Sequence, residues 1–397
     1  MSGSKIGLVL PGGGARGAFQ VGVLKATAEI LPGDVPNPFP ILSGTSAGAI
    51  NAAVLASRAR RFRSAVGEME AVWAGFRSEQ VFRTDALTML KSSLHWLATI
   101  VLGGLGEHNP RSLLDNDPLR SLLSRNIRFP RIQTAIDRGH VQALAITAAG
   151  YQSARSVTFF QASPGTRAWQ RTRRSGVRCV INLDHLMASI AVPLVFPPAC
   201  IRGEYYGDGA MRHSTPLSPA VHLGADRILV IGIRDETPEP AGDPHTPPIY
   251  PSFGHIAGYM LDTLFLDGLY SDLERLSRIN DLIDSIPEDE RTGPAAKMRP
   301  IDTMIVIPSE DIREIAASCR KAAPVPLRAL MRGLGGPDKG ERRLLSYLLF
   351  ESEFTRALID LGYRDAMTVR DELEAFVRGA DVPRLYAPTW MRRDLAV

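Results

Sequence analysis

The sequence predicts an α/β fold in which a mostly parallel central sheet is covered by helices and followed by a helical C-terminal extension. Short apolar runs alternate with helix-compatible segments, an alternation typical of a parallel sheet with crossover helices. The first two apolar runs each lead into a glycine-rich turn, at Gly12–Gly17 and Gly44–Gly48. With 397 residues, 45% hydrophobic and 22% charged, the chain has the composition of a globular protein large enough for a substantial core.

The expected elements follow from apolar runs, small-residue segments and turn signals in chain order. Strands are expected at Ile6–Leu10, Ile41–Gly44, Val141–Gly150, Ser156–Ala162, Arg227–Ile233 and Thr303–Pro308, and a strand with a turn at Glu204–Met211. Helices are expected at Ala18–Ile30, Ala47–Ser57, Ser64–Phe76, Pro118–Asn126, Leu183–Pro193 and Phe253–Ser285, with three further helical segments before Arg378.

These elements suggest three parts of the chain. Residues 1–237 are expected to form the α/β domain, and residues 238–252 a proline-rich loop or linker. Residues 253–397 are expected to form a mainly helical region that packs on the first domain.

The net charge of +4 suits an anionic membrane surface or a nucleic acid and identifies neither. No nucleic-acid-binding motif is present, so we expect no nucleic-acid partner. The three cysteines, Cys179, Cys200 and Cys319, are scattered, which favours a reducing compartment and offers no metal-binding spacing. With no secretory signal in the first residues, we expect a cytoplasmic protein with peripheral contact at the inner face of the membrane.

The first glycine-rich turn fits two kinds of anion site. Gly12, Gly14 and Gly17 satisfy G-x-G-x-x-G, the pattern of a dinucleotide-binding turn. A turn of this kind would equally bind the oxyanion of acyl transfer, because the backbone N–H groups at a helix start have no intrahelical acceptors. The dinucleotide interpretation also requires an acidic residue at the end of the second strand, where this chain has Leu42 and Ser43. The oxyanion interpretation is therefore favoured.

The second turn, Gly44-Thr45-Ser46-Ala47-Gly48, is a G-x-S-x-G sequence between an expected strand and an expected helix. This is the context of a nucleophile elbow, although the pattern also occurs as an ordinary turn of small residues. None of the eight histidines lies in a recognisable catalytic motif. Asp208, between Gly207 and Gly209, is the acidic residue that we consider as a catalytic base. The alternative interpretation of this segment is a plain hairpin turn with a D-G sequence.

Together these segments resemble the patatin-like phospholipase family, as a bacterial member, over about Lys5–Ile233. The family's motifs occur here in its order, as GGGARG (Gly12–Gly17), GTSAG (Gly44–Gly48), ASIAVP (Ala188–Pro193) and DGA (Asp208–Ala210). The resemblance implies a Ser–Asp dyad without histidine, with Ser46 as nucleophile and Asp208 as base. It also implies an oxyanion hole of backbone amides and no metal or organic cofactor. The oxyanion-hole residues would be Gly12, Gly13, Gly14 and Ala47, and the remaining motif positions Gly17, Gly44, Gly48, Gly209 and Ala210.

The expected function is hydrolysis of acyl esters in phospholipids or lysophospholipids through an acyl-enzyme. One alternative is an esterase or transacylase that acts on a different acyl ester. Another is a non-catalytic lipid- or nucleotide-binding protein that uses the glycine-rich turn. Oligomeric state does not follow from the sequence.

Several other residues have two interpretations. Arg16 could attract a lipid phosphate, but we favour a role in bracing the glycine-rich turn. Ser189 and Pro193 are expected to shape the wall of the site, and His213 to be a polar surface or structural residue. Tyr205 and Tyr206, if they line the site, would raise the pKa of Asp208.

The apolar segment Leu87–Leu114, which contains Trp96, Lys91 and Arg111, is either a lid that meets the bilayer or a buried helix and loop.

Overall fold

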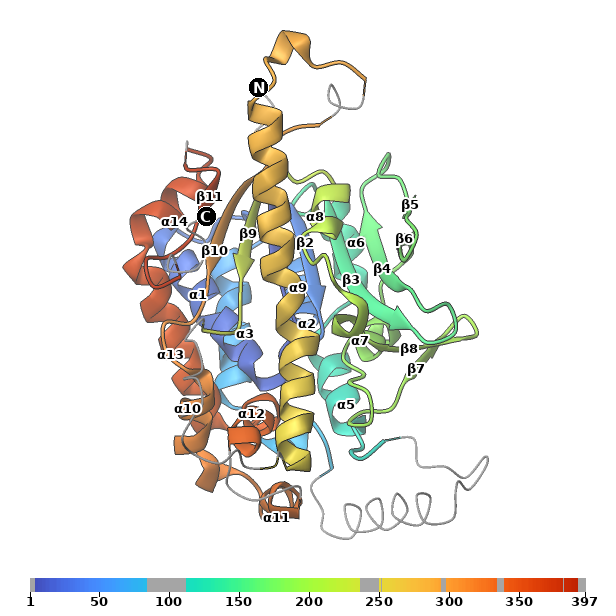
Figure 1. Cartoon of the computed structure of the whole chain (residues 1–397), viewed down its shortest axis with the longest axis vertical. Coiled ribbons are helices and arrows are strands. Elements are labelled where there is room, and N and C mark those ends of the chain that lie inside the picture. The colour runs from blue at the N-terminus through green and yellow to red at the C-terminus, as the bar shows by residue number, and fades with distance from the viewer. Residues whose placement is uncertain are drawn as a thin grey trace.

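A single twisted sheet runs through the molecule and carries helices on both faces (Figure 1). The computed structural model describes residues 4–83, 112–235, 250, 252–293, 298–333, 339–380 and 382–391. The strand order is β11 (Leu385–Tyr386), β10 (Asp302–Val306), β9 (Arg227–Ile231), β1 (Ile6–Leu10), β2 (Ile41–Thr45), β3 (Ala143–Gly150), β4 (Ser156–Ala162), β6 (Arg174–Arg178) and β5 (Trp169–Gln170). Two more strands, β8 (Glu204–Asp208) and β7 (Ala199–Ile201), pair with each other, and β8 also pairs with β3.

All neighbouring pairs from β11 to β3 are parallel, whereas β4 and β8 lie antiparallel to β3. Strands β1, β2, β3 and β9 are buried along their whole length, as expected for strands covered on both faces. Alternate side chains of β1 enter different cores: Leu8 and Leu10 face one, and Val9 faces the other. The sheet predicted from the sequence is therefore confirmed.

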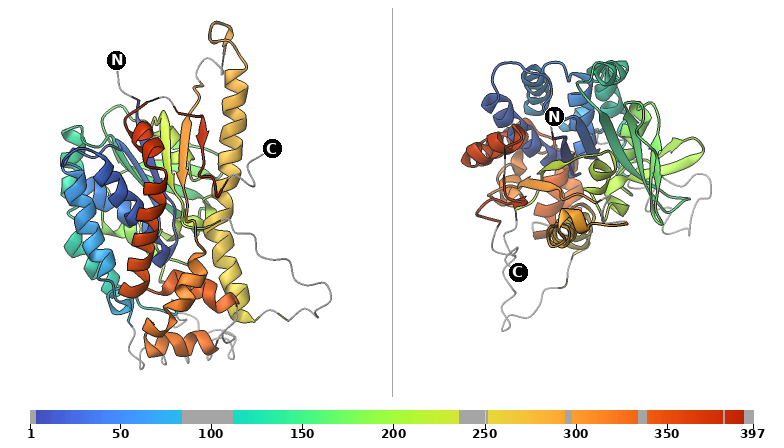
Figure 2. Two further views of the ribbon diagram at one scale, coloured as in Figure 1. Left: turned by 90° about the vertical axis from the view of Figure 1, so that its left-hand side faces the viewer. Right: turned by 90° about the horizontal axis from the view of Figure 1, so that it is seen from above.

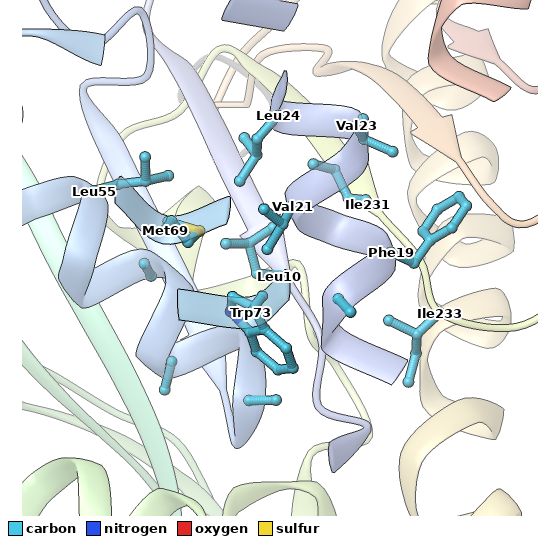
Figure 3. Close-up of a cluster of buried hydrophobic side chains, with 14 of the residues drawn as sticks. Leu10, Phe19, Val21, Val23, Leu24, Leu55, Met69, Trp73, Ile231 and Ile233 are labelled. Carbon is cyan, nitrogen blue, oxygen red and sulfur yellow. The ribbon is translucent and has the colours of Figure 1, made fainter. Parts of the chain in front are cut away.

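The larger core lies beneath α1 (Ala18–Ile30), α2 (Ala47–Ser57), α3 (Phe62–Ala74) and α13 (Ser352–Thr368). In Figure 3, Leu10, Val21, Met69 and Trp73 point into one shared cluster from β1, α1 and α3. The long helix α9 (Phe253–Asp284) covers the opposite face, as Figure 2 shows from above.

The remaining helices are shorter. They are η1 (Gly14–Gly17), η2 (Ser78–Gln80), α5 (Asp117–Asn126), α6 (Pro130–Asp137), α7 (Leu183–Ser189), η4 (Gly209–Arg212), α8 (Ser218–His222), η5 (Glu288–Glu290), α10 (Ile312–Ser318), η7 (Arg320–Ala322), α11 (Val325–Gly333), α12 (Lys339–Leu348) and α14 (Arg370–Val377). No helix among the described residues combines the length and the apolar character needed to cross a bilayer.

Residues after 252 are joined to the sheet and to its first helix. Strand β10 pairs with β9, and α13 lies against α1 at two glycines. A Cβ at Gly22 would lie 2.0 Å from the Ile359 carbonyl oxygen, and one at Gly362 would lie 2.2 Å from that of Phe19. The helical C-terminal extension is thus present and closely packed, although the division at 237 and 252 stays a prediction. Most of residues 238–252 fall outside the described residues.

Some element predictions were wrong. The helix expected over Leu183–Pro193 ends at Ser189, because the chain then turns so that the Ala191 carbonyl accepts the amide of Asp208 at 2.8 Å. Five α-helices, not three segments, lie between residues 312 and 377 in the described part of the chain. The short strands β5, β6, β7 and β11 were not predicted, because strands of two to five polar or mixed residues carry too little hydrophobic pattern.

Candidate active site

Ser46 occupies a strained turn between β2 and α2. Its φ of 53° and ψ of −125° lie where residues other than glycine are rare. The flanking glycines allow this turn to approach its neighbours. A Cβ at Gly44 would lie 2.4 Å from the Gly48 carbonyl oxygen, and one at Gly48 would lie 2.0 Å from that of Leu10. The G-x-S-x-G spacing therefore follows from sterics at this turn.

Ser189 holds the strained turn from α7. The Ser46 amide donates to Ser189 Oγ at 2.9 Å, and that hydroxyl donates to the Thr147 carbonyl of β3 at 2.7 Å. Both hydrogen bonds are buried. Sequence reasoning assigned Ser189 only a place in the wall, whereas the structure makes it the partner of the Ser46 amide.

Asp208 ends β8 and is 1% exposed. Its Oδ1 accepts the Ala210 amide at 2.9 Å, while Oδ2 is buried and has no hydrogen-bond partner among the described residues. Burial raises the pKa of Asp208 to about 7, against the lowering effects of the Ser46 hydroxyl and the Ala210 amide. The Ser46 hydroxyl is thus near enough to influence this pKa, yet it does not meet the geometry of a formed hydrogen bond. Such catalytic contacts are often long in free enzymes.

The glycine-rich turn lies against Ser46. A Cβ at Gly12 would lie 2.7 Å from Ser46 Cβ, and one at Gly17 would lie 3.0 Å from Ala47 Cβ. Gly13 is the N-cap of η1, Gly14 begins that helix and Ala47 begins α2, so their amides lie at helix starts and have no intrahelical acceptors. Gly14 has a φ of 56°, a conformation that favours glycine, and the Tyr347 carbonyl fills the space where its Cβ would lie.

Gly209 and Ala210 continue the turn after Asp208. A Cβ at Gly209 would lie 2.2 Å from the Thr147 carbonyl oxygen, so the turn packs directly on β3. The structure therefore brings every site residue that the motifs predicted to one end of the parallel strands.

A buried chain of side chains fixes the glycine-rich turn from behind. Trp73 Nε1 donates to Asn51 Oδ1 at 2.9 Å, and Asn51 Nδ2 donates to Gln20 Oε1 at 2.9 Å. Gln20 Nε2 in turn donates to the Pro11 carbonyl at 2.9 Å. These contacts link α3, α2 and α1 to the residue that precedes the turn. Sequence reasoning missed them because polar residues inside an apolar helix give no motif.

Arg16 braces the same turn, as the favoured interpretation predicted. It is 1% exposed, and its Nη2 lies 3.2 Å from Asp262 Oδ1 and 2.7 Å from Ser346 Oγ. Its guanidinium also stacks over the Tyr347 ring, 3.9 Å from the centroid. Asp262 additionally pairs with Arg343 at 3.3 Å and accepts the Tyr347 hydroxyl at 2.7 Å. Arg16 thus connects the turn to α9 and α12.

His213 and the two tyrosines have other partners. His213 Nδ1 lies 3.0 Å from Thr45 Oγ1, and burial lowers the pKa of the ring to about 4. Tyr205 is 48% exposed, and the Tyr206 hydroxyl donates to Glu204. Burial, and then the charge of Asp208, raise the pKa of Tyr151, which is 45% exposed.

An apolar cavity of about 50 Å³ lies beside Ser46. Its walls come from both the first part of the chain and the C-terminal helices. The lining residues are Gly14, Ser46, Ala47, Ile50, Trp73, Phe76, Val81, Leu119, Ile190, Val192, Val195, Phe196, Leu261, Phe265, Tyr347, Leu348 and Phe350. The contribution of α9 and α12 was not predicted, since nothing in their sequences marks them as part of a site.

The proposed lid segment Leu87–Leu114 lies outside the described residues except for its last three, so its two interpretations stay open. Among the described residues, no group of three His, Cys, Asp or Glu side chains is arranged to hold a metal ion.

The sequence itself places this site in a family. The family model described as patatin-like phospholipase matches residues 8–221, which is more than half of the chain. The chain belongs to the patatin-like phospholipase family. Membership supports a lipid acyl hydrolase activity and a lipid substrate. The family match ends before α9 and α12, which complete the cavity.

Two individual proteins are similar to this patatin-like chain. Lysophospholipase nte1 of Aspergillus terreus is 42% identical over 78 residues, which cover 17% of this chain and 5% of that protein. The chain therefore spans a small fraction of that relative's length. The crystal structure of VipD from Legionella pneumophila overlaps with a TM-score of 0.35 and 14% identity, over 93% of this chain and 67% of that one.

Proposed function

We propose that this protein hydrolyses acyl esters of phospholipids or lysophospholipids with a Ser46–Asp208 dyad. The observation that carries the proposal is the strained Ser46 beside a buried carboxylate whose Oδ2 has no partner among the described residues. A base with a pKa near 7 is matched to proton transfer at neutral pH. The apolar cavity beside Ser46 suits a hydrocarbon chain. The lysophospholipase name of one relative agrees with a lipid ester as substrate.

In the proposed reaction, Ser46 Oγ attacks the ester carbonyl carbon while its proton passes to Asp208. The amides of Gly13, Gly14 and Ala47 receive the oxyanion, with Gly12 packed against Ser46. The carbon–oxygen bond to the alcohol breaks, and Asp208 returns the proton to the leaving oxygen. Water then attacks the acyl-enzyme, gives a proton to Asp208, and releases the fatty acid as the proton returns to Ser46.

Contact with a membrane surface through Leu87–Leu114 is part of the proposal. Its support is the apolar and basic composition of that segment.

The test compares wild type with Ser46→Ala on a panel of phospholipids, lysophospholipids and p-nitrophenyl esters, together with labelling by a fluorophosphonate probe. We expect Ser46→Ala to lose labelling and to lower kcat by about 10³-fold or more, the scale of removing a nucleophile. Ser57→Ala, a serine at the other end of α2, is the matched control and should be labelled normally. Ser46→Ala activity within tenfold of wild type would exclude the nucleophile assignment.

The dyad is separated from a Ser–His mechanism by Asp208→Asn and His213→Ala. We expect Asp208→Asn to approach Ser46→Ala in kcat, because an amide does not accept the serine proton. His213→Ala should be mild, since its ring bonds Thr45. A loss of about 10³-fold or more in His213→Ala would instead favour a histidine base. Labelling without hydrolysis of any lipid, but with hydrolysis of other esters, would favour the esterase alternative.

A further inference from the structure

One face of α2 leads away from Ser46 and is the least enclosed part of an otherwise buried helix. Between residues 47 and 59, every side chain is buried except those of Ile50, Val54 and Arg58, which are partly exposed. These three follow Ser46 at successive intervals of four residues. Residues at this spacing lie above one another on a helix. A stripe of partly exposed side chains therefore follows the buried Ser46 along α2.

Two apolar cavities lie end to end along this stripe. The first, beside Ser46, includes Ile50 in its wall. The second, of about 60 Å³, lies between α2, α3 and α5. Its lining residues are Ile50, Val54, Arg58, Glu68, Met69, Val72, Trp73, Phe76, Leu119, Leu122, Leu123, Asn126 and Ile127. The two cavities share the four lining residues Ile50, Trp73, Phe76 and Leu119, so they are adjacent.

The far end of the stripe is polar. Arg58 Nε lies 2.5 Å from Glu68 Oε2, and Arg58 Nη1 donates to the Asn126 carbonyl at 2.8 Å. A hydrocarbon chain that reached this point would meet a partly exposed ion pair and gain no further apolar contact. The apolar path therefore has a defined length, from Ser46 to the level of Arg58.

The axial rise of an α-helix sets that length at about 12 Å from Ser46 to Val54 and about 18 Å from Ser46 to Arg58. An extended alkyl chain advances about 1.3 Å per carbon, given single bonds of about 1.5 Å. A chain bound to Ser46 would thus pass Val54 after about nine carbons and reach Arg58 after about fourteen.

We propose that the acyl chain of the substrate lies along this face of α2, through both cavities, and that Val54 and the Arg58–Glu68 pair set its preferred length. The proposal rests on the proposed function, because the chain is placed by its ester bond to Ser46. It assigns a single medium-to-long acyl chain to the site. The chain would pass beside Trp73 and Phe76, which line both cavities.

The experiment measures kcat/KM for p-nitrophenyl esters with chains of four to sixteen carbons, in wild type and in Val54→Phe. The added ring fills the second cavity, so the ratio of kcat/KM for the fourteen-carbon ester to that for the four-carbon ester should fall about tenfold or more. This is the effect of leaving two or more methylenes unburied. Val221→Phe makes the same change at a partly buried helix position remote from the path, and its ratio should match wild type.

A ratio unchanged in Val54→Phe, or lowered equally in Val221→Phe, would overturn the proposal. If Val54→Phe fails to fold, Leu122→Phe fills the same cavity from α5 and decides the question by the same ratio. The proposed function fails separately, if wild type hydrolyses no ester of any length. In wild type, rates should rise up to about fourteen carbons and fall at sixteen, and a monotonic rise through sixteen would contradict the limit at Arg58.

Discussion

Ser46 adopts a backbone conformation that serine rarely takes, and Asp208 places a carboxylate where charge is disfavoured. Neighbouring residues hold both the rare backbone conformation of Ser46 and the buried carboxylate of Asp208. The Ser46 turn is held by Ser189 and by the close packing of Gly44 and Gly48. The Asp208 side chain is held by the Ala210 amide on one oxygen only. Strain and desolvation of this kind cost stability, and they are common at catalytic sites.

The raised pKa of Asp208 makes a prediction for activity. The proposed base accepts a proton only when it is ionised, so kcat/KM should rise with pH and level off above about 7. Between pH 8 and pH 5 it should fall about 10²-fold, as expected for a single ionisation. The measurement is a pH profile on a neutral soluble ester. A flat profile from pH 5 to 8 would contradict the role of Asp208 as base.

The same pKa makes a prediction for stability. Above pH 7 Asp208 is charged in both the folded and the unfolded state, and burial penalises the charge only in the folded state. The rise from the ordinary value of 3.8 to about 7 corresponds to about 4 kcal/mol. Asp208→Asn should therefore raise the free energy of unfolding at pH 8 by up to about 4 kcal/mol.

The gain from Asp208→Asn should shrink as the pH falls from 7 toward 4, because the wild-type carboxyl is then protonated in the folded state. Urea unfolding at pH 8, 6 and 4 measures it. A variant less stable than wild type at pH 8 would show that the ionised carboxylate stabilises the fold.

At the scale of elements, the glycine-rich turn has different constraints at neighbouring positions. Gly13 has an extended φ of 173°, which any residue adopts. A larger residue at this position is restricted only by contact with a neighbouring side chain. A Cβ there would lie 2.0 Å from Ile233 Cδ1. Gly14 is limited by its φ of 56° and by the backbone of Tyr347, 2.3 Å from its would-be Cβ. Only the first constraint can be relieved by a second substitution.

We therefore expect Gly13→Ala to lower kcat by about 10²-fold, the scale of losing one oxyanion donor, as the turn shifts to relieve the clash. Adding Ile233→Val removes the clashing methyl group and should restore most of the activity. Gly14→Ala with Ile233→Val is the control, and it should stay impaired. Kinetics on a soluble ester tests both pairs. Failure of Ile233→Val to improve Gly13→Ala would mean that the clash is not the cause.

At the scale of the whole molecule, the site is assembled from segments far apart in the chain. Arg16 precedes α1, Asp262 lies in α9, and Arg343 lies in α12, yet the three side chains form one buried group of charges. Strand β10 and helix α13 add further contacts between the C-terminal part and the sheet. The C-terminal helices thus support the glycine-rich turn and also line the apolar cavity beside Ser46.

Asp262→Ala should destabilise the protein by about 3–5 kcal/mol, because it removes the buried carboxylate that Arg16 and Arg343 share. Glu310→Ala, which removes the exposed partner of Arg364, should cost less than about 1 kcal/mol. Denaturant unfolding compares the two variants. Equal losses in both would contradict the buried network as a source of stability.

The sequence alone determined the parallel sheet and the positions of β1, α1 and α2, and its family resemblance implied the grouping of Ser46, Asp208 and the glycine-rich turn. Hydrophobic runs and glycine spacings are local, so they can be identified without the fold. Only the tertiary structure decided that Ser189 accepts the Ser46 amide and that α9 and α12 complete the cavity. These roles depend on contacts between residues far apart in sequence, and a buried hydroxyl or carboxylate leaves no periodic signal. The pKa of Asp208 belongs with them, because burial is a property of the folded chain.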